Sequence, residues 1–500
     1  MINNQYYNTD RNMEEREIKD FYFEWQQRLH SLIEGYICDR EKNILPTRSI
    51  FSDFKNTLER FISNRLEEHE KIILLPGIRG VGKTTLLLQV LKIEKFISSA
   101  DYFLLENLKK IEEIIYIDAS FFKLNNISLN EFFNFYQHLK DFLFENLKKK
   151  IVLLLDEIHY DENWGLFLKS IFDRTKSHNN ILVIATGSSA INLRINPDLS
   201  RRVTIKEIFP LKFTEYLNIK HKIFPAAQLS EELREIIFNS TKAEGVYKEL
   251  NNKKGQIEKL GLNISSKIRQ DYFETGGFPF TIKISRKTDA IELVKNVINS
   301  IILKDIIPLK TFKTETISKI NSLIFLLAGS GKISFEKLQQ SLKIPEFRTL
   351  DSLMEVLVMS GLLVKVPSLG KSYVPARKTP RFLFISPTLR SAILDNFFSS
   401  DQEGTKLEDY FALLYQKDLK NKMSSELAYD ISDGGADFIL TGKDRKKIII
   451  ETGFGKEVVS QILNTQKKVN GKYGLVFGSR DLTMVEDFTV KIPLEYLMLI

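Results

Sequence analysis

The chain has 500 residues, of which 43% are hydrophobic and 27% charged, with a formal net charge of +8 and a pI of about 9.0. This length exceeds what one hydrophobic core sustains, and the ordinary globular composition excludes the disordered and collagen-like classes. No apolar run approaches the ~20 residues that cross a bilayer, which excludes a membrane-spanning helix. The N-terminus carries no secretory apolar segment and the single cysteine, Cys38, forbids an internal disulfide, so we expect a cytoplasmic protein with no membrane partner. The mild basic excess permits contact with nucleic acid, but it fits a lysine-rich surface equally well.

The first 45 residues are expected to be helical, and an amphipathic helix follows over 48–70. Short apolar runs then alternate with helical stretches. Strands are expected at 71–75, 114–117, 151–155 and 181–185, and helices at 83–93, 129–149 and 163–176. Strands without polar alternation, separated by helices, indicate a parallel sheet covered on both faces. Residues 46–210 are therefore expected to form an α/β domain.

The rest of the chain changes character twice. Residues 211–308 are mainly helical in pattern, and residues 309–399 have short helices and a hairpin. Residues 400–500 return to strands and helices, with strands expected at 437–440, 447–452, 473–477 and 490–492. Together with residues 1–45 and 46–210, this gives five expected parts.

A phosphate-binding loop is the most specific motif in the sequence. Residues 77–84 match G-x-x-x-x-G-K-[ST] between an apolar strand and a helix, as this motif requires. Lys83 is expected to reach the β- and γ-phosphates of ATP, and the Thr84 hydroxyl to bind Mg²⁺. The residues expected to contact the nucleotide are Gly77, Arg79, Gly80, Val81, Gly82, Lys83, Thr84 and Thr85.

Two adjacent carboxylates follow the apolar run at 151–155. In an open α/β sheet, ligands bind at the carboxyl ends of the strands, where Asp156 and Glu157 stand. Asp156 is expected to hold magnesium, and Glu157 to polarise the attacking water. An adjacent glutamate favours hydrolysis of the terminal phosphate over its transfer to a second substrate.

Further catalytic candidates come after the next strand. Ser188 or Thr186, in the run Thr-Gly-Ser-Ser, is a candidate for orienting the water, although an ordinary turn explains the run as well. Arg201 and Arg202 are candidates for stabilising phosphoryl transfer, within the chain or across a subunit contact, although surface arginines are common.

These motifs resemble those of archaeal-type AAA ATPases. The resemblance rests on G-x-R-x-x-G-K-T at 77–84, D-E-I-H at 156–159, T-G-S-S at 186–189, F-P-L-K-F-T-E-Y at 209–216 and G-G-F-P at 276–279. It covers roughly residues 50–500 and implies an α/β P-loop NTPase sheet of the AAA+/ASCE type, with a helical lid. It also implies a winged helix and a C-terminal α/β domain like that of PD-(D/E)-x-K restriction nucleases.

The winged-helix candidate consists of helices at 317–328, 334–342 and 348–360, with a wing at 361–367 and 371–374. Arg348 and Thr349 begin the helix that would enter a major groove. The side chains expected to meet phosphates are Lys365, Lys371, Arg377, Lys378 and Arg381. Packing or protein contact remains the alternative role.

The nuclease-like candidate has Glu408, Asp437 and Glu451 in the carboxylate positions. Gly453 occupies the lysine position, so the pattern is broken, and Lys456 would replace that lysine only if the chain bends. Gln461 and Gln466 are possible helpers. The preferred interpretation is an inactive nuclease fold kept as a binding platform.

Three functions remain open on the sequence alone. The first is a magnesium-dependent ATPase that contacts DNA through its C-terminal half. The second is a nucleotide-gated switch or scaffold with slow turnover, acting as a homo-oligomer or on a protein partner. The third is an ATP-activated nuclease using Asp437 and Glu451.

Overall fold

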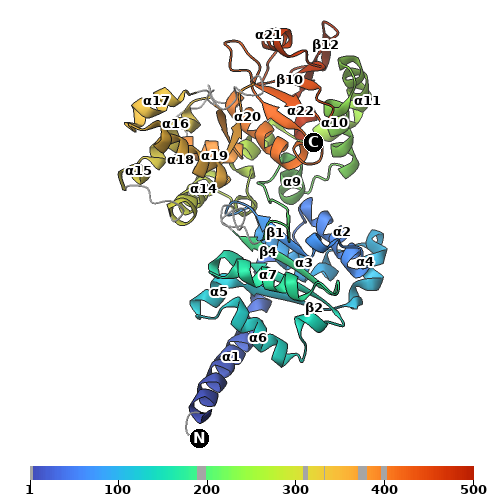
Figure 1. Ribbon diagram of the computed structural model, residues 1–500. Helices are drawn as coiled ribbons and strands as arrows, with labels where there is room; N and C mark the ends of the chain where they lie inside the picture. Colours follow the sequence, from blue (N-terminus) through green and yellow to red (C-terminus); the bar gives the residue numbers. More distant parts are fainter. Residues whose placement is uncertain (1–3, 188–198, 308–313, 332, 370–379, 396–402) are drawn as a thin grey trace. The chain divides into compact units, whose positions relative to one another are not determined.

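The computed structural model describes residues 4–187, 199–307, 314–331, 333–369, 380–395 and 403–500 (Figure 1). The chain divides into two compact units, Met1–Ile208 and Phe209–Ile500. The finer division into five parts remains a prediction.

A parallel five-stranded sheet forms the middle of the first unit (Figure 1). Its strands are β1 (Ile72–Pro76), β2 (Ile111–Asp118), β3 (Lys150–Asp156), β4 (Ile181–Gly187) and β5 (Thr204–Ile205), in the order β2-β3-β4-β1-β5. All neighbouring pairs are parallel. β1, β3 and β4 are buried along their whole length, as a sheet covered on both faces requires. The expected α/β fold with a P-loop NTPase sheet is confirmed.

Helices cover both faces of this sheet. They are α1 (Asn4–Ile37), α2 (Ile50–Ile62), α3 (Lys83–Leu91), α4 (Tyr102–Asn107), α5 (Ala119–Leu124), α6 (Leu129–Leu139) and α7 (Trp164–Arg174). On one face, α5, α6, α7 and Phe21 of α1 share a core with Leu74, Leu153 and Val183 of the strands. Alternate strand side chains point to the other face, and α3 packs on the sheet outside that core.

Two helices are shorter than expected from the sequence. α2 ends at Ile62 and α6 at Leu139, whereas helices over 48–70 and 129–149 were expected. Asn64 and Asp141 adopt left-handed backbone angles, with φ of 55° and 51°. Such a residue turns the chain back on its last helical carbonyls, usually with glycine in this position. The expected ranges were too long because the sequence has no glycine or proline at these positions to signal that the helix ends.

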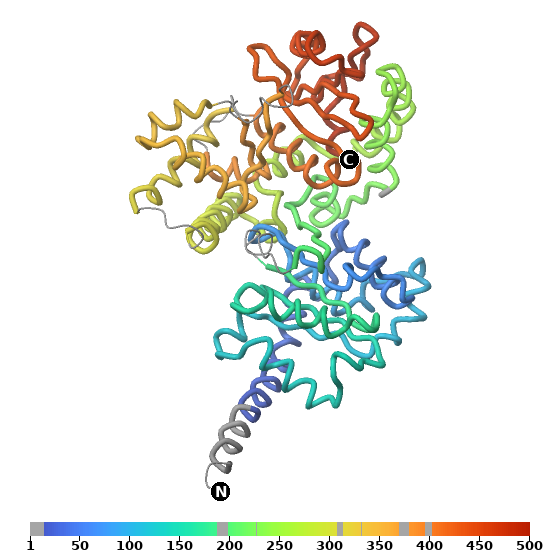
Figure 2. The backbone as a smooth tube through the Cα atoms, viewed as in Figure 1, coloured from blue at the N-terminus to red at the C-terminus, as the bar shows by residue number. Residues whose placement is uncertain are grey.

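The second unit contains a mixed six-stranded sheet and many helices, and Figure 2 traces the course of its backbone. Its strands, in the order β12-β13-β11-β10-β9-β8, are β8 (Glu426–Ala428), β9 (Phe438–Thr441), β10 (Lys447–Thr452), β11 (Tyr473–Ser479), β12 (Thr483–Val485) and β13 (Thr489–Pro493). Its helices are α9 (Phe213–Tyr216), α10 (Ala227–Asn239), α11 (Ala243–Gly261), α12 (Ser266–Asp271), α13 (Pro279–Ile282), α14 (Lys287–Ile301), α15 (Thr314–Ser318), α16 (Ile320–Gly329), α17 (Phe335–Leu342), α18 (Phe347–Met359), α19 (Pro387–Leu394), α20 (Glu403–Leu414), α21 (Ser460–Val469) and α22 (Leu494–Met498).

The segment expected to be a winged helix has its three helices, α16 to α18, near the expected places. The strand that follows, β6 (Leu363–Val366), pairs antiparallel with β7 (Arg381–Phe384). The expected strand at 371–374, together with Lys371, Arg377 and Lys378, lies outside the described residues. Arg381 is buried and ion-paired with Glu408, so the expectation that it meets a phosphate was wrong.

The run at 209–216 is anchored inside the second unit by buried ion pairs. Lys212 Nζ lies 3.1 Å from Asp418 Oδ2, and Lys417 pairs with Glu215. The side chains of Lys212, Glu215 and Asp418 are at most 9% exposed. Buried charges of this kind require partners. The residues of this motif are therefore explained by anchoring.

The glycines of the G-G-F-P run pack against the same segment. A Cβ on Gly276 would lie 2.8 Å from the Tyr216 ring, and one on Gly277 would lie 2.4 Å from Ser386 Oγ. The Leu211 N–H also donates to the Gly277 carbonyl at 2.8 Å. Only glycine permits such close approach, which explains this turn without a ligand.

Candidate functional site

The phosphate loop joins the end of β1 to the start of α3 (Figure 1). Gly80 and Gly82 have φ of 81° and 90°, a conformation that favours glycine. A Cβ on Gly77 would lie 2.5 Å from the Ile208 carbonyl oxygen. The glycines of the motif are therefore demanded by the local backbone, and they let successive N–H groups face an anion.

The Lys83 side chain folds back onto this loop. Its Nζ donates to the carbonyl oxygens of Gly77 at 2.9 Å and Ile78 at 3.2 Å, and the residue is 5% exposed. A buried ammonium held at the mouth of a ring of amides is suited to a phosphate. Arg48 supports the loop from outside, because its Nη1 donates to the Val81 carbonyl at 2.5 Å.

The expected magnesium ligands face one another. Thr84 lies beside Asp156, at the end of β3, the strand two places from β1, and its hydroxyl favours the ionised form of that carboxyl by lowering its pKa. Burial, together with the charge of Glu157, raises the pKa of Asp156 to about 6. A hydroxyl and a carboxylate are oxygen ligands of the kind Mg²⁺ takes, so Thr84 and Asp156 fit that ion.

Two more hydroxyls hold Asp156. The Thr186 hydroxyl donates to its Oδ1, and the Tyr116 hydroxyl donates to its Oδ2 at 3.0 Å. Thr186 is fully buried, so it serves the carboxylate and the turn that follows it. Ser188, the other candidate for orienting water, lies outside the described residues.

Glu157 stands directly after Asp156 in a left-handed conformation, with φ of 49°. Its N–H lies 3.1 Å from Asp156 Oδ1 and 3.2 Å from Thr186 Oγ1, which fixes the turn. Its Oε2 lies 3.6 Å from His159 Nδ1. A non-glycine residue held at positive φ is uncommon and occurs often at functional sites.

The two candidate arginines differ in their surroundings. Arg202 packs on α7, with its Nε 3.6 Å from Asp173 Oδ1 and its guanidinium 5.8 Å from the centre of the Phe172 ring. Arg201 is exposed. Arg201 is therefore the more exposed of the two, since the Arg202 side chain is 23% exposed.

A second candidate site lies in the second unit, at one end of β9 and β10. Asp437 and Glu451 are buried, and the Asp437 N–H donates to Glu451 Oε1 at 3.1 Å. Lys456 contacts Glu451, and its Nζ lies 3.8 Å from Asp437 Oδ2. The chain does bend as this requires, because Gly455 has φ of 65°.

Glu408 joins this cluster through Arg381. The Arg381 guanidinium donates to Glu408, and its Nη1 lies 3.7 Å from Asp437 Oδ1. Burial raises the pKa of both Glu408 and Glu451, with the Asp437 charge adding to the effect. Among the described residues, no three His, Cys, Asp or Glu side chains form a ready metal cage. A metal here would need further ligands from water or substrate, as Mg²⁺ commonly takes.

Gln461 and Gln466, the two possible helpers of the nuclease-like site, form different hydrogen bonds. Gln461 Nε2 donates to the Gly435 carbonyl at 3.2 Å, which steadies the loop before Asp437. Gln466 accepts from the Gly471 N–H at 2.7 Å and so closes a turn at the far end of α21.

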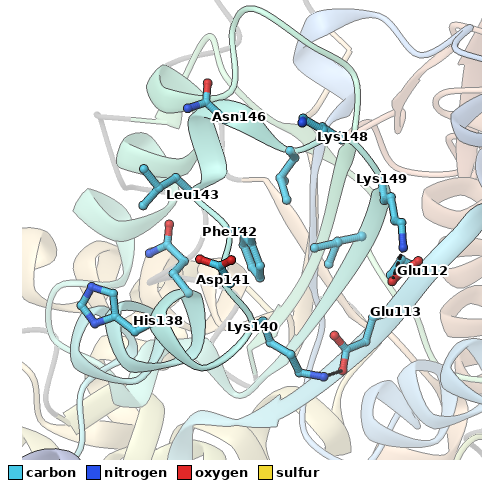
Figure 3. Close-up of a pocket in the computed structure, with 13 residues that line it drawn as sticks. Glu112, Glu113, His138, Lys140, Asp141, Phe142, Leu143, Asn146, Lys148 and Lys149 are labelled. Carbon is cyan, nitrogen blue, oxygen red and sulfur yellow. Dashed lines mark hydrogen bonds and ion pairs between the residues drawn. The ribbon is translucent and has the colours of Figure 1, made fainter.

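A surface hollow in the first unit lies away from the phosphate loop (Figure 3). It is lined by residues near the starts of β2 and β3 and the end of α6, and the ion pairs Lys140–Glu113 and Lys149–Glu112 cross it at 3.2 and 2.7 Å. Because the strands are parallel, their starts lie opposite the end that carries the phosphate loop. Because these lysines and glutamates pair with each other, the hollow is explained as an ordinary solvated surface.

Comparison with known proteins places the chain in a family. It is 32% identical over 453 residues to MJ1637, an uncharacterized protein of Methanocaldococcus jannaschii, and the match covers 89% of this chain and 88% of that protein. This chain belongs to the MJ1637 family. MJ1544 of the same organism is 26% identical over 279 residues, which cover 56% of this chain and 51% of that protein.

Within this MJ1637 family member, residues 69–217 match a AAA domain and residues 266–400 match a domain of unknown function. The AAA match, which includes the phosphate loop, β3 and β4, supports the resemblance to archaeal-type AAA ATPases. Among solved structures, the Walker-type ATPase PABY2304 of Pyrococcus abyssi is 16% identical with a TM-score of 0.40, covering 71% of this chain and 97% of that protein. None of the described helices is both long and apolar enough to span a bilayer.

Sequence reasoning missed the groups that support the AAA site from a distance. Arg48 lies 33 residues before the carbonyl it holds, and Tyr116 lies 40 residues before Asp156. Neither belongs to a contiguous motif. The one available signal was position, because Tyr116 lies near the carboxyl end of a strand that neighbours β3.

Proposed function

We propose that this MJ1637 family member is a magnesium-dependent ATPase. The observation that carries the proposal is the glycine-rich loop that holds the Lys83 ammonium, with Thr84 beside the buried Asp156 and Glu157 next in the chain. Thr84, Lys83 and the amides of residues 77–85 bind the nucleotide, and Asp156 and Thr84 hold the metal.

The residues act on the phosphate chain in separate ways. The Lys83 ammonium donates hydrogen bonds to the Gly77 and Ile78 carbonyls in this structure. When ATP binds, it donates instead to the β- and γ-phosphates. Magnesium held by Thr84 and Asp156 would supply positive charge to the phosphates. Glu157 orients the attacking water and receives its proton. Ser188 would assist with that water, and Arg201 or Arg202 would neutralise the leaving charge, with exposed Arg201 suited to a neighbouring subunit.

Two variants with matched controls test the ATPase. Lys83→Ala should abolish nucleotide binding, whereas Glu157→Gln should still bind ATP and lose about 10²–10⁴ in turnover. Lys95→Ala and Glu94→Gln, which change exposed side chains just beyond α3, should behave as wild type. Unchanged turnover in both site variants would refute the assignment.

We further propose that the second unit contacts DNA. Support comes from the basic net charge and from α16, α17, α18 and the β6–β7 hairpin, which form three helices and a two-stranded wing. Arg348 and Thr349 lie in the first turn of α18 and are the side chains for base contact. DNA-stimulated ATP hydrolysis supports this role, whereas slow turnover indifferent to DNA supports a nucleotide-gated switch or scaffold that acts through a protein partner or its own copies.

A second candidate function is magnesium-dependent cleavage of nucleic acid. The observation that favours it is the bend at Gly455, which brings Lys456 to Glu451 and Asp437 although Gly453 replaces the expected lysine. Asp437→Ala should abolish any magnesium-dependent cutting, and Asp481→Ala, at an exposed position of the same unit, should not. No cutting by the wild type, with ATP hydrolysis intact, leaves the cluster as a structural ion network.

A further inference from the structure

A lysine-lined hollow lies at the tip of the hairpin between β9 and β10. Its lining includes Lys443 and Lys446 from the tip, Lys472 from the segment before β11, and Lys422 from the segment after α20. Phe238 of α10 and Ile448 of β10 form part of its floor. The hollow is thus built from four stretches that are distant in the sequence.

The hairpin tip is held in a fixed conformation. The Gly442 N–H donates to the Lys446 carbonyl at 3.0 Å, and the Arg445 N–H donates to the Gly442 carbonyl at 2.9 Å. Asp444 Oδ1 accepts from the Lys446 N–H at 3.1 Å. These bonds engage the backbone and leave the side chains of Lys443, Arg445 and Lys446 exposed.

The positive charges around the hollow are not balanced by its carboxylates. The hollow has four lysines and two carboxylates, Glu235 and Asp444; Asp444 lies 3.6 Å from Lys446 Nζ, and Lys422 is paired with Asp418 at 2.6 Å. Within the described part of the chain, neither Lys443 nor Lys472 has an ion-pair partner. The ammonium groups of neighbouring lysines repel one another, and an anion bound between them would offset that repulsion.

Lys472 is the least exposed member of this group. Its backbone N–H donates to the Lys447 carbonyl at 2.7 Å, which ties it to the start of β10, next to the hairpin tip. Burial lowers the pKa of its ammonium; the charge of Asp444 opposes this, and the nearby Lys446 adds a smaller lowering. A further anion in the hollow would stabilise this ammonium through its opposite charge, as Asp444 already does in part.

We propose that this hollow binds the phosphate backbone of DNA through Lys443, Lys446 and Lys472. Lysines grip phosphates by replacing the counterions around them, without reading sequence. The inference rests on the proposed contact with DNA and locates that contact outside the winged-helix segment. It makes the six-stranded sheet a binding platform, whether or not its carboxylates cut.

The hollow is separate from the carboxylate cluster. Asp437 precedes β9 and Glu451 ends β10, whereas the tip lies at the opposite end of both strands. From Asp437 to Gly442 the chain advances about five strand residues, or about 17 Å. Substitutions at the tip therefore leave the carboxylates and Lys456 in place.

The test measures binding of a fluorescent DNA duplex to the full chain by anisotropy, without nucleotide, at several salt concentrations. Replacing Lys443, Lys446 and Lys472 together by Gln should weaken binding and reduce the slope of log K against log salt by about 2.7, because each lost phosphate contact removes about 0.9. The control is Lys248→Gln with Lys254→Gln and Lys259→Gln on α11, which packs at the β12–β13 side of the sheet. It should leave the slope unchanged.

A second variant protects the test against misfolding. Lys443→Gln with Arg445→Gln changes only exposed tip side chains and should reduce the slope by about 0.9 to 1.8. If the wild type binds DNA and both tip variants bind as it does, the location is wrong and the DNA contact stands. If the wild type binds no DNA, the proposed contact falls together with this inference, while ATP hydrolysis is judged by its own assay.

Discussion

Replacing Asp418 by Asn tests the anchoring of the 209–216 run in the second unit. Asp418 is 1% exposed, and its oxygens lie 3.1 Å from Lys212 Nζ and 2.6 Å from Lys422 Nζ. Burial raises the pKa of this carboxyl, but Lys212, Lys422 and Lys417 outweigh burial and hold the pKa at about 2. The ionised carboxylate is therefore strongly preferred in the folded state.

The magnitude follows from this pKa. A drop from the ordinary 3.8 to about 2 corresponds to about 2 kcal/mol of folding stability at neutral pH. Asn also leaves Lys212 buried without its carboxylate, and breaking a buried pair costs about 3–5 kcal/mol. We expect the Asp418→Asn variant to lose about 2–4 kcal/mol. Because the folded pKa is depressed, the carboxylate's contribution is full above the ordinary pKa and is lost as pH falls toward 2, so the deficit shrinks in acid.

Urea unfolding measures this loss, and the position of the tryptophans helps to assign it. The chain has two tryptophans, Trp25 and Trp164, and both lie in the first unit. Circular dichroism follows helices of both units, whereas tryptophan fluorescence follows the first unit. The control is Asp289→Asn, whose partner Arg286 has a side chain 79% exposed, so its loss should stay within about 0.5 kcal/mol.

Unfolding of the second unit should appear in circular dichroism but not in tryptophan fluorescence. We expect Asp418→Asn to lower the urea midpoint of that transition. A midpoint equal to that of wild type, or equal to that of Asp289→Asn, would refute the reasoning. The 209–216 run would then need an explanation other than anchoring.

Two further predictions concern the nucleotide site. Gly77→Ala places a Cβ 2.5 Å from the Ile208 carbonyl and should cost about 1–3 kcal/mol and weaken ATP binding, measured by calorimetry, whereas Gly255→Ala, with open space at its Cβ on α11, should stabilise the chain by about 0.5–1 kcal/mol. His159→Ala frees Glu157 from a neighbour 3.6 Å away and should lower single-turnover hydrolysis about tenfold to a hundredfold and change its pH profile, with ATP affinity unchanged. An equal loss of affinity would show instead that His159 supports the whole loop.

The sequence by itself determined the parts of this protein whose chemistry is contiguous. The glycines at 80 and 82, Lys83 and Thr84 occupy one short run, and an apolar strand leads directly to Asp156 and Glu157. Apolar runs also located β1 to β4, since a strand buried on both faces needs no polar alternation. Such signals depend only on near neighbours in the chain.

Only the tertiary structure decided which distant groups meet. It paired Asp156 with Thr84, Thr186 and Tyr116, because parallel strands bring separate chain segments to one edge. It ended α2 at a left-handed Asn64, a residue type that gives no firm local stop signal. It also returned Lys456 to Glu451 through one glycine turn, where spacing along the chain had indicated a broken motif. For Asp156 the deciding contacts join residues 30 and 40 positions apart, which no local pattern in the sequence records.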